Sequence, residues 1–298
     1  MFYWLFTEGR ALLGGCLAPL LCLTLTAPIV VSAVASVAAV LLLFRLVARE
    51  FGERIGKRAA IFMLIFPTAY FLHIGYTEAL FLALVFGSPL AARSDRWWLA
   101  GLLGGLAALT RVNGLLLIVV LAAEAWLAWR ADRRWRAEWA AIGLVAVGFG
   151  VYLGVNYAVY GNPFEFLRIQ NEHWFKSLAW PWQGIGGVIG YLSNPDLEDA
   201  VMYGIAEMTA IVLGLVGTVV AAFRYRPGWF AWMTGNWLLF VSTSFVLSVP
   251  RYTLTMFPLF AWFAQLAERR WLGLLLGGLS VTLLLWFSAR FATGAWAF

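Results

Sequence analysis

Charged residues are scarce in this sequence: Asp, Glu, Lys and Arg make up only 12% of its 298 residues. Soluble domains are about a quarter charged, so the composition excludes an ordinary soluble protein. Hydrophobic residues reach 63%, and the mean hydropathy is +0.83. Uncharged apolar runs at 11–44 and 227–250 are long enough to cross a membrane. The sequence therefore predicts an integral membrane protein, with residues 1–298 forming a single transmembrane domain.

Cysteine is nearly absent as well, and the two that occur, Cys16 and Cys22, lie six residues apart in an apolar run. On a helix they would face different directions, so we expect neither a disulfide nor a CxxC-type metal site. The chain also lacks a credible zinc-protease, nucleophile-elbow, P-loop or dinucleotide-binding motif. Its first residues lack the basic region of a signal peptide. Any function must therefore be sought in isolated polar groups within the apolar sequence.

Apolar segments separated by short polar loops predict an all-α fold, a polytopic transmembrane helical bundle with about 10–11 membrane segments. Several have only 15–17 residues, fewer than the roughly 20 of a full crossing, and we expect these to be tilted or sheltered by neighbouring helices. Residues 1–27 are either an interfacial segment, which we favour, or an extra span. The other predicted segments are 28–48, 59–75, 78–92, 97–111, 114–130, 139–159, 201–223, 229–249, 252–267 and 271–289.

Basic residues indicate the orientation. Lysine and arginine are in excess in cytoplasmic loops, so the side on which most of them fall is predicted to be cytoplasmic. The net charge of +6 is therefore a signal of membrane topology, and we expect a lipid bilayer as partner and no nucleic acid. The loops that hold 15 of the 21 Lys and Arg residues are 45–58, 93–96, 130–136, 224–226 and 268–270.

The unusual polar motifs then fall together on the opposite, extracytoplasmic face. Four hairpin ends that converge on one surface predict a site there. Both histidines of the chain, His73 and His173, belong to this group. The motifs are HIGYTE (73–78), TRVNG (110–114), the extracytoplasmic loop 160–200 and SVPRY (248–252).

Glu78 is the catalytic candidate, because a carboxylate at membrane depth is costly and usually pairs or lines a polar cavity. It could act as a general base, bind a metal or accept hydrogen bonds from substrate hydroxyls. His73, Tyr76 and Thr77 are substrate-binding candidates beside it. Alternatively, Glu78 is a helix N-terminal acid that complements the helix dipole.

Two arginine motifs are candidates for contact with a phosphate. Arg111 and Asn113 lie at the outer end of a predicted span, and Arg251 and Tyr252 follow a helix-breaking proline. A guanidinium can hold a phosphate through two parallel hydrogen bonds, which lysine does less well. Alternatively, Arg111 reaches lipid headgroups or forms a structural pair with Glu78.

The loop 160–184 interleaves polar residues with tryptophan, which suits a sugar whose C–H face stacks while its hydroxyls form hydrogen bonds. Alternatively, the tryptophans belong to the aromatic belt at the membrane surface, although the polar residues between them are harder to explain that way. The acids of NPDLEDA (194–200) suggest a divalent metal, but they follow Asn-Pro, and we expect them to begin a helix. The substrate-binding candidates in the loop are Arg168, Gln170, Glu172, His173, Trp174 and Trp182.

Four segments, in this order, resemble the PIG-V-type mannosyltransferases: FPTAYFLHIGYTEALFLAL, RWWLAGLLGGLAALTRVNGLLLI, NPFEFLRIQNEHW…WPW and SVPRYTLTMFPLF. The resemblance covers roughly residues 28–290. It implies a GT-C glycosyltransferase, a polytopic helical enzyme with its site on the extracytoplasmic side. Such an enzyme moves a sugar, mannose in the PIG-V family, from a polyprenyl (dolichyl-type) phosphate to a hydroxyl of a glycolipid, glycan or protein acceptor.

The resemblance also implies roles for the matching residues. The family's first span and first outer loop, which carries the aspartate expected to act as base, would precede the matched region, and we expect this chain not to include them. Glu78 or another outer-face acid would then have to replace that base. The lipid-linked sugar donor is the expected ligand, and a divalent metal is left open. The roles implied are a place beside the cavity for Tyr76, Thr77 and Glu78, donor-phosphate contact for Arg111, Arg251 and Tyr252, and cover of the cavity for Gln170 and Trp174.

Two other classes stay open. A lipid-linked sugar transporter or flippase would line a path with its Glu and Arg residues, although the chain shows no convincing internal repeat. The other open class is a catalytically silent membrane subunit. With the site facing outward, we expect a bacterial plasma membrane, or the endoplasmic reticulum membrane in a eukaryote. For a transferase, Glu78→Gln and Arg111→Ala should each lower sugar transfer without loss of folded protein.

Overall fold

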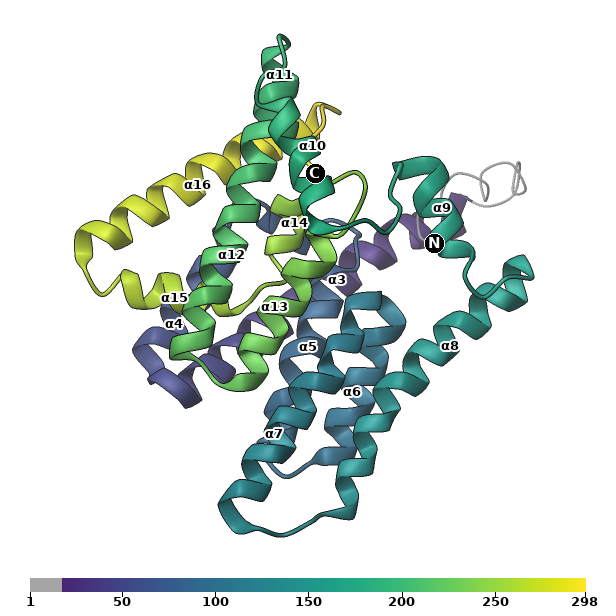
Figure 1. Cartoon of the computed structure of the whole chain (residues 1–298), viewed down its shortest axis with the longest axis vertical. Coiled ribbons are helices and arrows are strands. Elements are labelled where there is room, and N and C mark those ends of the chain that lie inside the picture. Colours follow the sequence, from purple (N-terminus) through teal and green to yellow (C-terminus); the bar gives the residue numbers. More distant parts are fainter. Residues whose placement is uncertain (1–17) are drawn as a thin grey trace.

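The computed structural model describes residues 18–298, with side chains placed from residue 27 onward. Within that part of the chain the protein is helical and has no strand, which confirms the predicted all-α bundle (Figure 1). Cys16, the side chain of Cys22 and most of the predicted segment 1–27 lie outside the described residues. The helical elements are α3 (Ala18–Phe51), α4 (Glu53–Leu64), η1 (Ala69–Leu72), α5 (Glu78–Ala92), α6 (Trp97–Thr110), η2 (Val112–Leu116), α7 (Leu117–Asp132), η3 (Ala137–Ile142), α8 (Gly143–Tyr160), α9 (Glu165–Trp174), α10 (Pro181–Tyr191), α11 (Leu197–Asp199), η4 (Ala200–Ala206), α12 (Glu207–Arg224), α13 (Pro227–Val241), α14 (Val249–Thr253), α15 (Pro258–Leu266) and α16 (Arg270–Ala292).

Several helices have the length and composition of membrane spans. α5 and α6 are also apolar but shorter. α16 projects from the body of the molecule and α8 lies along its outer side (Figure 1), and only 11% of each spanning window is buried. Their apolar side chains face outward, as they do in lipid, and the chain is a multi-pass membrane protein. The stretches long enough to cross are Ala27–Phe51, Val112–Asp132, Ala137–Tyr160, Leu197–Arg224 and Arg270–Ala292.

Three predicted spans are interrupted. The predicted segment 59–75 stops being an α-helix at Leu64 and continues as an irregular connection that contains η1. The segment 229–249 ends at Val241, and the segment 252–267 is divided between α14 and α15. Proline explains the last division, because Pro258 has no N–H to donate to the preceding turn. These interruptions bring polar side chains to helix ends inside the bundle.

The helix α3 begins earlier than predicted. The backbone of residues 18–26 is already helical and runs through Pro28 into the predicted segment 28–48. The choice between an interfacial segment and an extra span for 1–27 stays a prediction.

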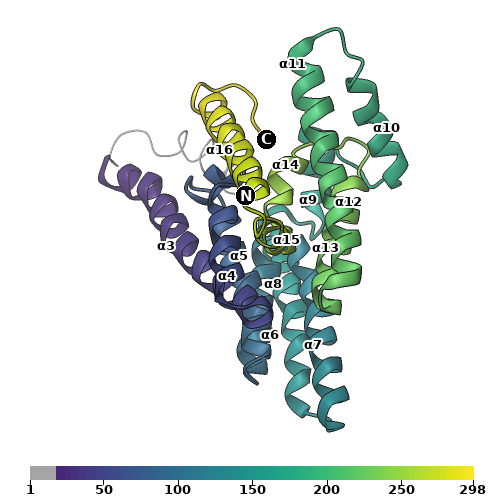
Figure 2. The same ribbon diagram turned by 90° about the vertical axis from the view of Figure 1, so that its left-hand side faces the viewer.

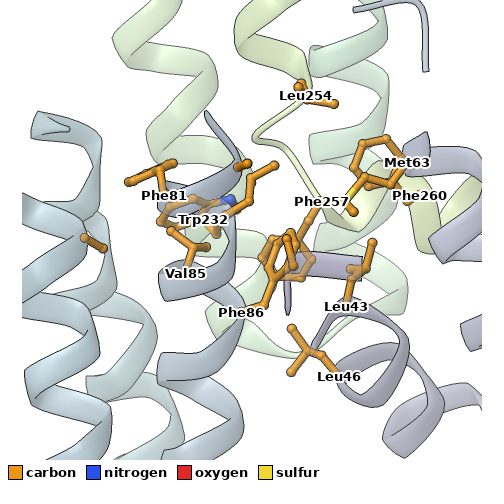
Figure 3. Packing of buried hydrophobic residues seen from close by; sticks show 14 of the residues in the cluster. Leu43, Leu46, Met63, Phe81, Val85, Phe86, Trp232, Leu254, Phe257 and Phe260 are labelled. Atoms are coloured by element: carbon orange, nitrogen blue, oxygen red, sulfur yellow. The ribbon is translucent and has the colours of Figure 1, made fainter. Parts of the chain in front are cut away.

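A single large core joins the N-terminal and C-terminal halves of the described chain. Phe86 packs edge-on against Phe257 with ring centroids 5.3 Å apart, and Phe257 also contacts Trp229 at 5.2 Å. Leu43 of α3 and Trp232 of α13 are fully buried in the same cluster (Figure 3). This packing holds α3, α5 and α13 around the segment that leads from α14 to α15.

Glycine allows α6 and α8 to lie in direct contact, as the small residues of GLLGGL (101–106) predict. A Cβ atom built on Gly148 would lie 2.0 Å from the carbonyl oxygen of Gly105. Any larger side chain at that point would therefore separate the two backbones.

An ion-pair network closes the basic end of the bundle. Arg93, at the end of α5, donates to Glu50 of α3 and to Glu124 of α7 at 3.0 and 2.8 Å. Arg226, before α13, donates to the same two carboxylates. Three of the predicted cytoplasmic loops, 45–58, 93–96 and 224–226, therefore meet with α7 at one end. Both views place the α7–α8 loop and α11 at opposite ends of the molecule (Figure 1, Figure 2).

Candidate active site

A cavity of about 520 Å³ opens where the polar motifs meet, away from the basic loops. Its wall mixes cationic and aromatic side chains with a stretch of the C-terminal segment. The lining residues are Tyr76, Arg111, Gln170, Trp174, Lys176, Ser248, Arg251, Tyr252, Phe291 and the stretch Gly294–Phe298.

Two arginines of the cavity wall share one buried carboxylate. Glu78, the first residue of α5, has no exposed surface. Its Oε1 accepts hydrogen bonds from Arg111 Nη1 at 2.5 Å and from Arg251 Nε at 2.7 Å. Its Oε2 has no partner among the residues that the structure describes. Each guanidinium is 18% exposed, so both face the cavity while Glu78 lies behind them.

Aromatic faces hold these guanidinium groups in place. The Cζ of Arg251 lies 4.2 Å from the ring centre of Phe71 and 4.6 Å from that of Tyr76. Arg111 lies 5.9 Å from the ring centre of Tyr252. A cation within about 6 Å of a ring face is attracted to it, so the arginines keep a defined position without a second carboxylate.

The loop after α9 supplies a third cation. The Nζ of Lys176 donates to the carbonyl of Leu247 at 2.8 Å and lies 3.4 Å from the hydroxyl of Tyr252. Three cationic side chains of the described chain therefore line the cavity, and Glu78 is the carboxylate paired with the two arginines. The wall carries an excess of positive charge, which suits an anionic group such as a phosphate.

Backbone pairing attaches the same loop to the segment before α14. Ser244 N donates to the carbonyl of Ser177 at 2.9 Å, and Ala179 N donates to that of Ser242 at 3.1 Å. This short antiparallel contact fixes Lys176 over the cavity.

The segment after α16 forms the remaining wall. The hydroxyl of Tyr70 donates to the carbonyl of Ala297, and Arg290 Nε donates to that of Trp296 at 3.1 Å. Trp296 lies beside Trp174, with ring centres 6.5 Å apart. Two indole rings therefore border the cavity on the side of the outer loop.

The sequence model described as Glycosyltransferase family 87 matches residues 15–249. The chain belongs to glycosyltransferase family 87. This is a GT-C-like family of membrane glycosyltransferases. No curated protein and no solved structure gave a match.

Membership of glycosyltransferase family 87 supports the predicted transferase class over the transporter alternative. The resemblance to the PIG-V-type enzymes stays a hypothesis, because the match is to another family of the GT-C-like kind. Six of the residues predicted from sequence line the cavity of this family-87 chain. They are Tyr76, Arg111, Gln170, Trp174, Arg251 and Tyr252.

Glu78 does not line the cavity, and its two guanidinium partners make it a poor proton acceptor. The structure favours the alternative that paired it with Arg111, and adds Arg251 as a second partner. The alternative of a helix N-terminal acid also agrees with its place as the first residue of α5. In this structure it pairs with both arginines of the wall.

Asn113 turns away from the cavity. Its Nδ2 donates to Oδ1 of the buried Asn236 at 2.9 Å, which ties η2 to α13. Thr77 precedes α5 without a side-chain capping bond and does not line the cavity. Neither residue lines the cavity, so substrate contacts of Thr77 and Asn113 stay predictions.

Arg168 and Glu172 of α9 lie outside the cavity wall. Arg168 pairs with Glu165 and Glu172 on its own helix. Hydrogen bonds from Arg168 lower the pKa of Glu165, so this ion pair persists over the neutral range. Neither Arg168 nor Glu172 lines the cavity, so their substrate contacts stay predictions.

The remaining candidates are also outside the cavity wall. His73 and His173 are exposed. Trp182 stacks on Trp180 with ring centres 5.0 Å apart, and both rings are largely exposed. That exposure agrees with the aromatic-belt alternative for this pair.

The acids at 194–200 begin a helix, as predicted. Asp196 caps α11 by accepting hydrogen bonds from the backbone N–H groups of Glu198 and Asp199. Glu198 also pairs with Arg290. Within the part of the chain that the structure describes, no three His, Cys, Asp or Glu side chains come together as a metal site.

Sequence reasoning missed three parts of the wall: Lys176, Ser248 and the C-terminal segment. Lys176 carried a usable signal, because it is a charged residue among the tryptophans of the outer loop. The segment 291–298 carried no such signal in the sequence, because it is apolar. It becomes part of the cavity wall only through its position in the folded structure.

Proposed function

We propose that this chain transfers mannose from a polyprenyl-phosphate donor to an acceptor hydroxyl on the extracytoplasmic face of the membrane. The observation that carries the proposal is the group of Arg111, Arg251 and Lys176 around one cavity, with a single carboxylate paired to the arginines. In sugar transfer the phosphate becomes the leaving group and gains charge, and cations placed around it stabilise that charge.

The aromatic part of the wall suits the sugar. Tyr76, Trp174 and Trp296 present ring faces or edges to the cavity, and Gln170 offers a hydrogen-bonding amide beside them. The acceptor is a glycolipid, glycan or protein that presents a hydroxyl at the outer surface.

The orientation of the chain supports a plasma membrane location in a bacterium. Basic loops gather at the end opposite to the cavity, and cytoplasmic loops are the basic ones. The cavity then faces the cell exterior, where lipid-linked sugars replace nucleotide sugars as donors.

Transfer of radiolabelled mannose from polyprenyl-phosphate mannose tests the proposal, with the protein in liposomes made from a lipid extract of its host membrane. The wild type should form a labelled product, and Arg251→Ala should lower the rate by at least about a hundredfold, because the leaving phosphate loses a charged partner. Arg136→Ala, at the opposite end, is the control and should retain the full rate. A wild type without transfer would contradict the proposed mannose donor, and an active Arg251→Ala would exclude the assigned site.

A further inference from the structure

A second buried acid, Glu207, lies outside the cavity wall but is joined to it through the backbone. It is the first residue of α12 and has no exposed surface. Its Oε1 accepts a hydrogen bond from Ser248 N at 2.5 Å, and its Oε2 accepts one from Val249 N at 2.8 Å. Within the described chain Glu207 has no ion-pair partner, so these two amides satisfy it.

The backbone that Glu207 binds is the start of α14, which carries Arg251 and Tyr252 two and three residues further on. Ser248 has a φ of +70°, a left-handed conformation that is unfavourable for a residue with a side chain. That conformation directs two consecutive N–H groups to one side. A carboxylate with both oxygens free to accept is the group that matches them.

The approach of Glu207 to this turn depends on an unusual helix. Residues 200–206 form the π-helical segment η4, directly before Glu207. A π-helical turn changes the direction in which the following side chains point, and such turns are frequent at functional sites. Glu207 thus faces the turn before α14 from an otherwise apolar span.

The carbonyl groups of the same turn are held from other elements. Lys176 donates to the carbonyl of Leu247 at 2.8 Å, and Thr68 Oγ1 donates to that of Pro250 at 3.0 Å. The N–H groups of Ser248 and Val249 both donate to Glu207. Loss of Glu207 would leave two buried donors without an acceptor, and the turn would have to rearrange to reach one.

We propose that Glu207 is a positioning residue that fixes α14 so that Arg251 and Tyr252 face the cavity. The identity of the ligand in this proposal rests on the proposed function. The positioning role of Glu207 rests on its hydrogen bonds to Ser248 and Val249. Glu207 touches no substrate and acts only through the turn at Ser248 and Val249.

Three variants test the proposal in the full-length protein. Glu207→Gln keeps the size of the side chain but replaces one acceptor oxygen by a donor, so one N–H group would face an N–H₂ group. Glu207→Ala removes both acceptors. Thr218→Val is the control, because Thr218 is a buried residue of the same helix whose hydroxyl bonds only to Gly214 within α12.

Two measurements are made on each variant: hydrogen exchange of the amides of residues 248–254, and affinity for farnesyl phosphate as a short prenyl phosphate. In Glu207→Gln and Glu207→Ala, exchange in this stretch should rise by about tenfold and the dissociation constant should rise by about tenfold. Exchange in α7 and α13 should stay as in the wild type. Thr218→Val should match the wild type in both measurements.

Other results would overturn the proposal. Unchanged exchange at 248–254 in Glu207→Gln would show that the carboxylate does not hold the turn, and an equal rise throughout the bundle would show a general scaffold role. Faster local exchange with unchanged affinity would show that Arg251 and Tyr252 do not depend on it. If the wild type fails to bind farnesyl phosphate, the proposed donor class fails, and local exchange alone then decides the role of Glu207.

Discussion

Arg251 shows how one side chain can be held by the bundle and still face a ligand. Glu78 binds it from behind, and the rings of Phe71 and Tyr76 lie beside its guanidinium, with ring centres 4.2 and 4.6 Å from Cζ. A guanidinium has five N–H donors in a planar arrangement, so pairing with one carboxylate oxygen leaves donors for a second anion. Lysine has no flat face to stack on a ring, so it could not replace Arg251 in the same position.

Glu78→Gln should lower both stability and sugar transfer. Breaking a buried ion pair by removing one partner costs about 3–5 kcal/mol, and the partial exposure of the arginines places the expected loss at the lower end. The midpoint of thermal unfolding of the purified protein, followed by tryptophan fluorescence, should therefore fall. From the sequence alone we expected Glu78→Gln to cause no loss of folded protein. We now expect lower stability, because Glu78 forms two buried ion pairs.

The control for this experiment is Glu53→Gln, whose ion pair with Lys57 lies on an exposed face of α4. Exposed pairs contribute little, so its midpoint and transfer rate should equal those of the wild type. A Glu78→Gln protein with an unaltered midpoint and full transfer would contradict the role assigned to the carboxylate.

Helix ends, rather than helix faces, supply most of the cavity. Arg111 follows α6, and Arg251 belongs to the short α14. Interrupted helices leave backbone groups without partners inside the membrane, and such backbone is tolerated where it is buried in protein or lines a cavity. The capping of α14 by Glu207 is one way in which this chain satisfies that requirement.

Gly148→Val should separate α6 from α8 and destabilise the protein. A Cβ at Gly148 would lie 2.0 Å from the carbonyl oxygen of Gly105, and overpacking of this kind typically costs about 1–3 kcal/mol or more. Gly150→Val is the matched control on the same helix, since nothing lies within 4 Å of its Cβ position. Thermal unfolding should show a lower midpoint for Gly148→Val alone, and equal midpoints for both variants would show that the helices do not touch there.

The molecule as a whole has two chemically different ends. One is closed by the network of Arg93, Glu50, Glu124 and Arg226, and the other holds the cavity. Between them lies the aromatic core around Phe257 (Figure 3). A cavity at one end above a packed core is the arrangement expected of an enzyme that works on one side of a membrane.

Cysteine labelling in intact cells tests the orientation. After Cys16 and Cys22 are replaced by serine, a single cysteine is introduced as Leu178→Cys or Trp135→Cys, at positions that are 92% and 82% exposed. A membrane-impermeant maleimide should label Leu178→Cys directly and Trp135→Cys only after the cells are opened. The reverse pattern would place the cavity in the cytoplasm and exclude the proposed donor side.

Much of the site could be predicted from the chain because its polar residues are rare. In a sequence with 12% charged residues, each charge inside an apolar segment stands out, and Arg111, Arg251 and Trp174 were found in this way. The same argument did not place Asn113 or Arg168 in the cavity wall, since a polar residue can also be satisfied by a structural partner, Asn236 for Asn113 and the neighbouring acids of α9 for Arg168.

Hydrophobicity and the placement of basic residues were sufficient to establish the helical membrane fold, because these properties act through composition and order along the chain. The direction in which each polar side chain points depended on packing. For Glu78 the sequence left a base and a structural partner of Arg111 both open, and packing placed two distant arginines beside it. Glu207 drew no prediction from the sequence. Its partners, the amides of Ser248 and Val249, are more than 40 residues away in the chain. Contacts over such separations follow from the way the helices pack, and no local pattern in the sequence specifies them.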